Sequence, residues 1–478
     1  MHSYLASLRR RRLSVNQTGE WNKARKIIIG IIDVLLFIGS LLLSFYLKFG
    51  RNIPLINFDA FQGSIAYVSV IFIIVNILFG TYIFYNKSIS DFLFITVIGQ
   101  FVLSLIIMAL TFAGRWLAFP RSVILINFFV GTILLFLFRV MVFKMYQSMS
   151  GSKRVMIVGM EKEVFAAVDN FTNTKSIRHM VTHVVLSDYY ENVLRHLEEI
   201  DIVYLASQIE ESEKLKIYDL LTSKEKKMFL NTSFENLIMV NPNMMNIEDE
   251  SIIEVSPFRI SAEDGLMKRI IDIAVALIGI VITSPIMAVT AFLVKKSSEG
   301  PVFYKQTRIT KDGKEFEILK FRSMGVTAEK DSGPVLATSN DMRVTKVGKY
   351  LRSLRIDELP QLFNVLLGDM SLVGPRPERP FFVDQFKELN PHYYLRHNVR
   401  AGITGYAQVY GKYASDFNSK LNFDLIYIKK YSLILDLKIM LQTVKILFDK
   451  VSSRGVDESE RAILTEQEIE ARGIRVIY

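Results

Sequence analysis

The sequence predicts a membrane protein that combines α-helical and α/β parts. Half of its 478 residues are hydrophobic and its mean hydropathy is positive, which is unusual for a soluble protein. Four apolar segments of membrane-spanning length come first, and alternating strand and helix patterns follow them. A fifth apolar run then precedes a more polar C-terminal half. We therefore expect four N-terminal transmembrane helices, a Rossmann-like α/β module, a re-entrant membrane helix and a C-terminal α/β domain with interfacial helices.

The composition narrows the possible function classes. The formal net charge is +10, with 58 basic against 48 acidic side chains. Because membrane segments are present and no nucleic-acid motif occurs, this charge indicates an anionic lipid surface or an anionic substrate. Cysteine is absent, which excludes disulfides, thiolate catalysis and cysteine-ligated zinc. The six histidines do not form the His-Glu-x-x-His pattern of a helical zinc site.

Residues 1–26 form a basic N-terminus, and its first apolar run is too long for a signal peptide and lacks a small-residue cleavage site. The positive-inside rule places this N-terminus in the cytoplasm, and four crossings return the chain there at about residue 145. Asp33 lies inside the first span, and we expect it near the cytoplasmic interface rather than facing a neighbouring helix. Residues 27–145 hold the four expected spans: Lys26–Lys48, Ile65–Tyr85, Phe92–Ala113 and Val123–Phe143.

Residues 150–255 form the Rossmann-like module. Buried-strand patterns alternate with helical ones, which favours a parallel sheet. Gly159 follows the first strand, but no Gly-x-Gly-x-x-Gly fingerprint surrounds it. Side chains there obstruct the close backbone approach that a dinucleotide needs, so we expect a structural or regulatory module without bound NAD. The expected strands are Arg154–Val158, Val181–Leu186, Ile202–Ala206 and one beginning at Phe229, and the expected helices are Glu161–Phe171 and Glu210–Leu221.

The apolar run at residues 267–296 opens the C-terminal domain, which we place at residues 265–450. Its length alone favours a fifth transmembrane helix. However, Lys268-Arg269 and Lys295-Lys296 flank its two ends, and the charge rule places both ends on the same side. Ser284-Pro285 lies in the middle, where proline removes a helical hydrogen bond. We therefore expect a helix–break–helix that enters one leaflet and returns, with Ser284 satisfying a freed backbone group.

Two adjacent carboxylates, Asp357 and Glu358, are the centre of this domain. We expect Asp357 to cap a short helix that Gly368 ends, so that the helix dipole keeps the carboxylate ionised. Arg355 precedes the pair, and Arg376 follows it between two prolines that hold the arginine stiffly.

Such a cluster suggests chemistry on phosphates. A carboxylate beside a phosphoryl group can hold Mg²⁺ or attack phosphorus as a nucleophile. The arginines then neutralise charge on the phosphates and on the transition state. The competing interpretation is a solvated acidic pair at a helix start with surface ion pairs, and the flanking arginines favour a site.

The last part of the domain gives a helical pattern from Phe423 to Phe448. This pattern fits either a core helix or a helix in the membrane interface, and both can share one helix. Residues 451–478 form a charged C-terminal tail, which we expect to be a short solvated helix or a partner-binding segment.

The order of motifs in residues 265–450 resembles the bacterial sugar transferase family, the monotopic polyprenyl-phosphate phosphoglycosyl transferases. The upstream spans and module are similar in layout to the large members that initiate capsule and exopolysaccharide synthesis. The motifs are the Ser284-Pro285 break, Phe303-Tyr304-Lys305-Gln306-x-Arg308, Lys320-Phe321-Arg322-Ser323-Met324, Asp357-Glu358-Leu359-Pro360-Gln361, Gly374-Pro375-Arg376-Pro377 and Gly402-Ile403-Thr404-Gly405.

This resemblance implies a reaction. A sugar-1-phosphate passes from a UDP-sugar to undecaprenyl phosphate, giving undecaprenyl-diphosphate-sugar and UMP. The resemblance makes Asp357 the nucleophile that forms a phosphosugar-aspartyl intermediate, and makes Glu358 a residue that positions Mg²⁺ or handles the acceptor's proton. Asp357 and Glu358 are the expected Mg²⁺ ligands. The residues expected to bind phosphate are Arg376, Arg355, Arg322, Lys305, Arg308 and Arg400.

The resemblance also implies a place and partners. We expect a multi-pass protein of the bacterial inner membrane with its catalytic domain in the cytoplasm, active on glucose or galactose, with downstream glycosyltransferases as partners. Independently of the resemblance, packing between the N-terminal spans suggests a homodimer. A non-catalytic membrane scaffold and a polytopic transporter remain competing classes. The intact acidic pair argues against the first, and the absence of paired broken spans argues against the second.

Overall fold

The computed structural model describes residues 23–84, 87–114, 120–150, 152–172, 179–297, 299–325, 343–411, 416–447 and 464–478. Most of the basic N-terminus, and the loop at 326–342, lie outside these residues. The chain forms two compact units. The first comprises residues 1–230 and 463–478, and the second comprises residues 231–462. The boundary of the predicted module at residue 255 is therefore wrong, because residues 231–255 pack with the second unit.

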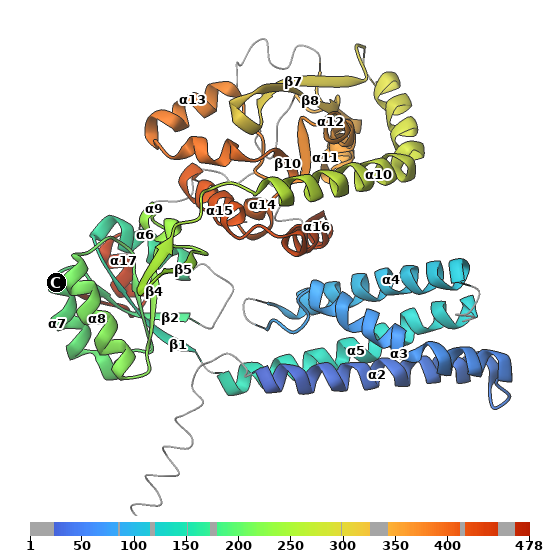
Figure 1. Ribbon diagram of the computed structural model, residues 1–478, viewed down its shortest axis with the longest axis horizontal. Helices are drawn as coiled ribbons and strands as arrows, with labels where there is room; N and C mark the ends of the chain where they lie inside the picture. The colour runs from blue at the N-terminus through green and yellow to red at the C-terminus, as the bar shows by residue number, and fades with distance from the viewer. Residues whose placement is uncertain are drawn as a thin grey trace, which may run out of the picture. The chain divides into compact units, whose positions relative to one another are not determined.

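Four long apolar helices begin the first unit, as predicted, and Figure 1 shows them lying along one another. Each is long and apolar enough to cross a membrane. Aliphatic side chains and phenylalanines form their shared core, in which Phe37 stacks on Phe72 at 4.4 Å between ring centroids. The second helix starts about ten residues earlier than predicted, because Pro54 precedes its first turn. Gly80, at a φ of 64°, follows the end of this helix. The four helices are α2 (Lys23–Phe49), α3 (Leu55–Leu78), α4 (Ile89–Gly114) and α5 (Arg121–Ser150).

Asp33 faces the neighbouring helices of the bundle, so the prediction that it would not do so is wrong. Its side chain is fully buried and pairs with Arg139 of α5 at 2.7 Å. The Arg139 guanidinium also donates to Asn76 of α3 at 2.7 Å and to Thr96 of α4 at 2.9 Å. An unpaired charge inside an apolar bundle costs free energy. The last of the four helices, α5, supplies the partner for Asp33 of the first helix. One arginine thus links all four helices.

The rest of the first unit is a parallel sheet with strand order β11-β2-β1-β3-β4, covered by short helices. This confirms the predicted Rossmann-like pattern, including a strand at Phe229. At the first turn, the Ser207 hydroxyl accepts a hydrogen bond from the Met160 N–H at 2.8 Å. The strands are β1 (Lys153–Val158), β2 (His179–Val185), β3 (Ile202–Leu205), β4 (Lys227–Leu230) and β11 (Arg475–Ile477), and the helices are α6 (Glu161–Thr172), α7 (Tyr189–Arg195), η1 (Leu197–Glu199) and α8 (Glu211–Ser223).

The C-terminal segment is part of this sheet, not the solvated tail that we expected. A capping box between Thr465 and Glu468 starts α17 (Glu466–Ala471), and strand β11 then pairs with β2. Leu464, Ile469 and Ile474 are buried in the core of the sheet. The segment is highly charged, so its three buried apolar residues form no recognisable pattern in the sequence. They come together only in the folded sheet.

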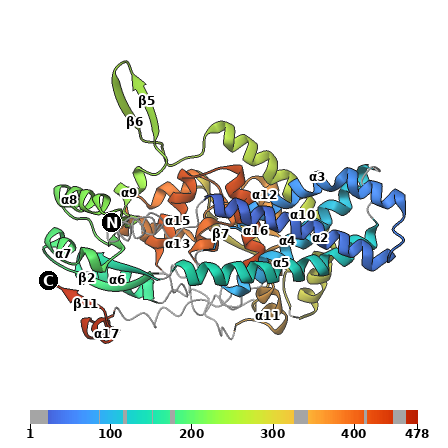
Figure 2. The same cartoon turned by 90° about the horizontal axis from the view of Figure 1, so that it is seen from below.

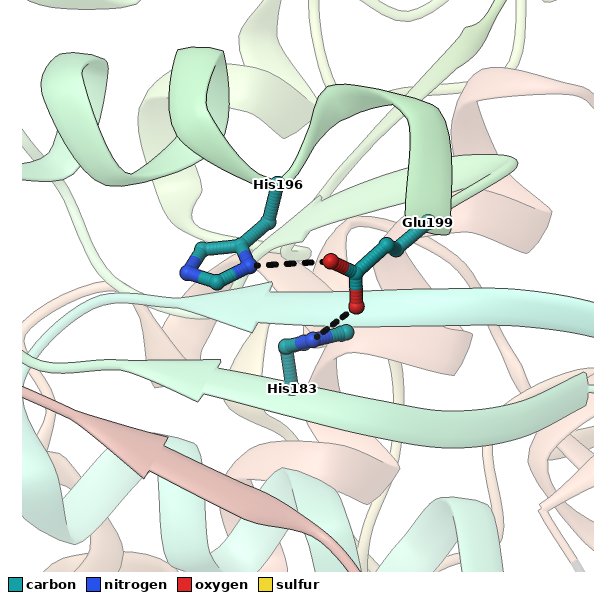
Figure 3. Close-up of side chains that lie close together, drawn as sticks. All are labelled: His183, His196 and Glu199. Atoms are coloured by element: carbon teal, nitrogen blue, oxygen red, sulfur yellow. Dashed lines mark ion pairs between the residues drawn. The ribbon is translucent and has the colours of Figure 1, made fainter.

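A polar cluster joins the same elements (Figure 3). The carboxylate of Glu199 lies 3.3 Å from His183 on β2 and 3.6 Å from His196 after α7. Arg475 of β11 lies 3.4 Å from the Glu199 oxygen that faces His183. The cluster therefore links the C-terminal strand to the middle of the chain.

The described residues of the second unit are mainly helical and form two-stranded sheets, so the predicted α/β character is confirmed only in part. β7 (Phe303–Ile309) and β8 (Glu315–Phe321) form an antiparallel hairpin, and β9 (Met370–Val373) pairs in parallel with β10 (Ala401–Thr404). A hairpin of β5 (Asn243–Ile247) and β6 (Glu250–Glu254) projects from the unit (Figure 2). The helices are α9 (Phe234–Ile238), α10 (Ala262–Ser297), α11 (Lys346–Ser353), η3 (Ile356–Glu358), α12 (Gln361–Leu367), α13 (Pro380–Leu389), η4 (Tyr393–Asn398), α14 (Tyr406–Tyr410), α15 (Phe417–Lys429) and α16 (Leu433–Leu447).

Helix α10 covers the fifth apolar run. It is continuous through Pro285 rather than broken, and Figure 1 shows it changing direction along its length. Ser284 donates its hydroxyl to the Val281 carbonyl at 2.9 Å, as expected for a side chain that satisfies the backbone beside a proline.

Both ends of α10 contact other elements of the second unit. Near the start, Asp272 accepts a hydrogen bond from the Leu372 N–H of β9 at 3.1 Å. Near the end, Val294 packs with Phe321 of β8 and Leu351 of α11. A straight helix of 36 residues is about 54 Å long, so a straight crossing would carry these ends far apart.

The predicted long helix from Phe423 to Phe448 is two helices, α15 and α16. The chain turns between them because the Ser432 hydroxyl accepts the Leu435 N–H at 3.1 Å and starts a new helix. Asp436, in the first turn of α16, pairs with Lys268 of α10 in the interior. Both helices therefore pack in the core.

Candidate active site

The acidic pair lies in a short 3₁₀ turn, η3, immediately before α12. Arg355 precedes the turn in the left-handed region at a φ of 53°, a strained conformation for a residue with a side chain. Helix α12 begins only at Gln361, with Pro360 at the N-cap position. The prediction that Asp357 caps the helix is therefore wrong, because the turn closes through the backbone instead. Gly368 ends the helix at a φ of 97°, as predicted.

Three cations converge on Glu358 rather than on Asp357. Lys320 Nζ lies 3.0 Å and Arg376 Nη2 lies 3.4 Å from Glu358 Oε1, and Arg355 Nη1 lies 3.6 Å from Oε2. Burial alone would raise the pKa of Glu358, but Lys320, Arg376 and Arg355 together hold this pKa well below its usual range. Glu358 is therefore ionised at physiological pH and fixed in place.

Asp357 has the opposite environment. Its side chain is buried, and burial, followed by the charge of Glu358, raises its pKa against the opposing effect of Lys320 and Arg352. The expected stabilisation of the ionised form by a helix dipole is thus outweighed. Two neighbouring carboxylates with pKa values shifted in opposite directions are typical of catalytic sites.

The two prolines hold Arg376 as predicted. Pro375 and Pro377 are buried, while the Arg376 side chain is exposed and points its guanidinium to Glu358. Two further arginines hold this segment by hydrogen bonds to its backbone carbonyls. Arg396 donates to the Arg376 carbonyl at 3.0 Å, and Arg308 donates to the Pro377 carbonyl at 3.0 Å.

Those two arginines are themselves anchored in the interior. Arg396 forms a buried ion pair with Asp424 of α15 at 2.8 Å. Burial lowers the pKa of Arg308 to about 10, against the opposing effect of Glu378, which lies 3.6 Å away. Arg308 and Arg396 thus position the Pro-Arg-Pro segment, and of these three arginines Arg376 presents its charge at the site.

Three of the predicted phosphate-binding residues have other partners. Arg322 donates to the Glu299 carbonyl at 2.7 Å, just beyond the end of α10. Lys305 pairs with Glu317 at 2.8 Å on an exposed face of the β7–β8 hairpin. Arg400 donates to the Gly368 carbonyl at 3.0 Å and caps the end of α12. Each of these three contacts is with a backbone carbonyl or a surface carboxylate of the same unit.

The sequence prediction missed Lys320 as a site residue. Lys320 and Arg322 are two residues apart and would share one face of an unbroken strand, but β8 ends at Phe321, so the alternation stops before Arg322. Arg352 belongs to the arginines that bracket the acidic pair in the sequence, although it was not among the predicted site residues: it donates to Ser323 at 2.8 Å and opposes the raised pKa of Asp357. Lys320 belongs to a motif that the sequence had marked, but its contact with Glu358 could not be read from that motif.

The acidic pair can contribute oxygen ligands to a metal ion, but unequally. Each oxygen of Glu358 already faces a cation, whereas the ion pairs of the described residues leave Asp357 without one. Mg²⁺ prefers one or two carboxylates together with substrate phosphates and water. The residues fit such an ion with Asp357 as the principal protein ligand.

The part of the chain that contains this site is similar to known proteins. Residues 263–450 match the model of the family described as bacterial sugar transferase. The chain is 49% identical over 193 residues to the UDP-N-acetylgalactosamine-undecaprenyl-phosphate N-acetylgalactosaminephosphotransferase of Aeromonas hydrophila, an alignment that covers 40% of this chain and 45% of that protein. It is 44% identical over 212 residues to the UDP-glucose:undecaprenyl-phosphate glucose-1-phosphate transferase of Klebsiella pneumoniae, covering 42% and 45%.

The chain thus aligns with less than half the length of these two relatives. A UDP-glucose:undecaprenyl-phosphate glucose-1-phosphate transferase of Caulobacter vibrioides is 41% identical over 186 residues, and this alignment covers 37% of the chain but 68% of that protein. The shared part begins at the start of α10 and includes the acidic pair and the Pro-Arg-Pro segment. The chain belongs to the bacterial sugar transferase family.

Proposed function

We propose that this protein transfers a sugar-1-phosphate from a UDP-sugar to undecaprenyl phosphate, releasing UMP. The observation that carries the proposal is the acidic pair, in which a buried Asp357 lies beside a Glu358 held ionised by three cations. The transfer would be the first step in building a capsular or exopolysaccharide repeat unit. The homodimer and the contact with downstream glycosyltransferases belong to the same proposal.

The mechanism has two displacement steps at phosphorus. A carboxylate oxygen of Asp357 attacks the β-phosphorus of the UDP-sugar, and the bond from this phosphorus to the bridging oxygen breaks, so UMP leaves. A phosphate oxygen of undecaprenyl phosphate then attacks the aspartyl-bound phosphorus and frees the Asp357 carboxylate. Arg376 lies at the exposed edge of the site, where its fork can pair with phosphate oxygens.

Glu358 has a positioning role in this mechanism. Its ionised carboxylate orients Lys320 and Arg376, and its charge raises the pKa of Asp357, which makes that carboxylate a more basic nucleophile.

Magnesium is part of the proposal. Bound to Asp357, with Glu358 next to it, Mg²⁺ would neutralise charge on the donor diphosphate. We expect EDTA to stop UMP release and excess Mg²⁺ to restore it, as measured by coupled UMP detection. Full activity in EDTA, after removal of metal by dialysis, would contradict the magnesium assignment.

The membrane arrangement is also proposed. The four N-terminal helices would cross the bacterial inner membrane, and α10 would enter the cytoplasmic leaflet and return. The contacts of Asp272 and Val294 with other elements of the second unit support this return. The catalytic domain would then lie in the cytoplasm, where nucleotide-activated sugars are made.

The test is UMP release by purified protein in nanodiscs with undecaprenyl phosphate, Mg²⁺ and a panel of UDP-sugars. Glucose and N-acetylgalactosamine lead the panel because relatives use them, and galactose is the further expected donor. Release with one donor, accompanied by a lipid-linked product, is the expected result. No release with any donor would favour a scaffold that keeps the site only for binding.

The electrostatics of the site predict a change in pH dependence. Lys320 lowers the pKa of Asp357, so Lys320→Met should raise it further. Because the nucleophile acts ionised, activity rises with pH through this pKa, and the acidic limb of the kcat/KM profile should move to higher pH. Lys305→Met is the matched control, since Lys305 pairs with the exposed Glu317 on the same hairpin. Equal shifts in both variants, or none in Lys320→Met, would contradict the assignment.

A further inference from the structure

An apolar groove lies between the second half of α10 and helix α11. Its volume is about 550 Å³. The α10 wall includes Pro285, Val289 and Leu293, and the α11 wall includes Tyr350 and Leu354. Tyr350 and Leu354 are 73% and 61% exposed, although a soluble surface rarely leaves such neighbours uncovered.

The groove ends at the site. Ile356 is one of its lining residues and is the residue immediately before Asp357. Exposed side chains of α10 outside the groove, such as Val281 and Phe292, are also apolar. The groove therefore connects an apolar helix that is long enough to enter a membrane with the carboxylate that we propose as nucleophile.

From this geometry we infer that the groove holds the isoprenoid chain of the acceptor, next to its phosphate. The inference rests on the proposed function and names where its lipid substrate lies. Pockets of about 300–1,000 Å³ take a drug-sized ligand, so the groove accepts the first isoprene units and leaves the rest of the chain in the bilayer.

Charge on α11 supports this occupant. Lys346 and Lys349 are exposed on the same helix that lines the groove, and Arg352 interacts with Asp357. An apolar groove beside a helix that carries exposed cations fits an amphiphile with an anionic head and an uncharged tail. A neutral peptide helix would satisfy the groove but not these charges.

The first measurement is photolabelling of the full-length protein in nanodiscs by farnesyl phosphate that carries a diazirine on its chain. We expect the label on the peptides that contain residues 285–293 and 347–356. Undecaprenyl phosphate should compete with it, and excess phosphatidylglycerol should not. Label elsewhere, or equal competition by the phospholipid, would overturn the inference, the second result indicating a site for bulk membrane lipid.

Kinetics of variants provide the second measurement. Val289→Trp fills the groove and Leu354→Asn makes it polar, whereas Val281→Trp and Leu277→Asn change exposed residues of α10 outside it in the same way. In wild type, KM should fall from dimethylallyl phosphate to farnesyl phosphate. The groove variants should lose about 10-fold in kcat/KM for farnesyl phosphate, equivalent to about 1.4 kcal/mol, and the controls should not.

UMP release without acceptor separates this inference from the proposed function. The groove variants should release UMP in a single turnover at the wild-type rate, because the donor step does not use the groove. If the wild type releases no UMP, the proposed function is wrong. The photolabelling experiment still tests the groove in that case. Normal release together with an unchanged dependence on chain length in both groove variants would refute the groove assignment.

Discussion

Asp357→Asn is expected to abolish UMP release, lowering kcat by about 10⁴-fold or more, the scale seen when a covalent nucleophile is removed. The amide keeps the shape of the side chain but cannot attack phosphorus. The measurement is a UMP-release assay in nanodiscs with the donor that wild type uses. Asp384→Asn is the matched control, because Asp384 is an exposed carboxylate on α13 of the same unit.

The same substitution should not reduce stability. The pKa of Asp357 is raised in the folded state, so its contribution to stability is present below its unfolded pKa and is lost as pH rises through its folded pKa. At neutral pH the ionised carboxylate therefore opposes folding, and asparagine should leave Tm unchanged or higher. An inactive variant with a clearly lower Tm would instead indicate a structural role.

Arg139→Met is expected to destabilise the membrane unit by about 3–5 kcal/mol, the usual result of leaving one partner of a buried pair uncompensated. Asp33 would then lie fully buried without its cation, and Asn76 and Thr96 would each lose a donor. Thermal unfolding in detergent, followed by the loss of monodisperse protein, measures the effect.

Two further variants define the cause. The double variant Asp33→Asn with Arg139→Met removes both charges and should recover much of the lost stability. Arg121→Met, at the exposed start of α5, should have little effect. A double variant as unstable as Arg139→Met alone would contradict the ion-pair explanation.

The sequence predicted those parts of the site that are local in the chain. The acidic pair, the Gly368 helix end and the stiff Pro-Arg-Pro segment depend on neighbouring residues, and the structure has all three. It did not predict which carboxylate the cations would meet. That choice depends on β8 bringing Lys320 to Glu358 across 38 positions of sequence, and on Arg322 leaving the strand pattern at Phe321.

The fold shows the same division. Apolar length identified α2 to α5 and α10, because burial in lipid leaves a long unbroken pattern. Asp33 was misplaced because its partner lies 106 positions away. The last strand was missed because β11 has only three residues and is stabilised by pairing with β2 rather than by its own pattern. Long-range pairing leaves little trace in a single sequence.

The most direct test of the central claim is intact-mass spectrometry of the protein after incubation with its UDP-sugar donor and Mg²⁺ in the absence of acceptor. The mechanism predicts an added mass equal to one sugar phosphate, mapped by peptide analysis to Asp357 and lost on addition of undecaprenyl phosphate. The adduct should be absent from Asp357→Asn. Rapid turnover by a protein that never carries the adduct, or an adduct on a different residue, would contradict the assignment of Asp357 as the nucleophile.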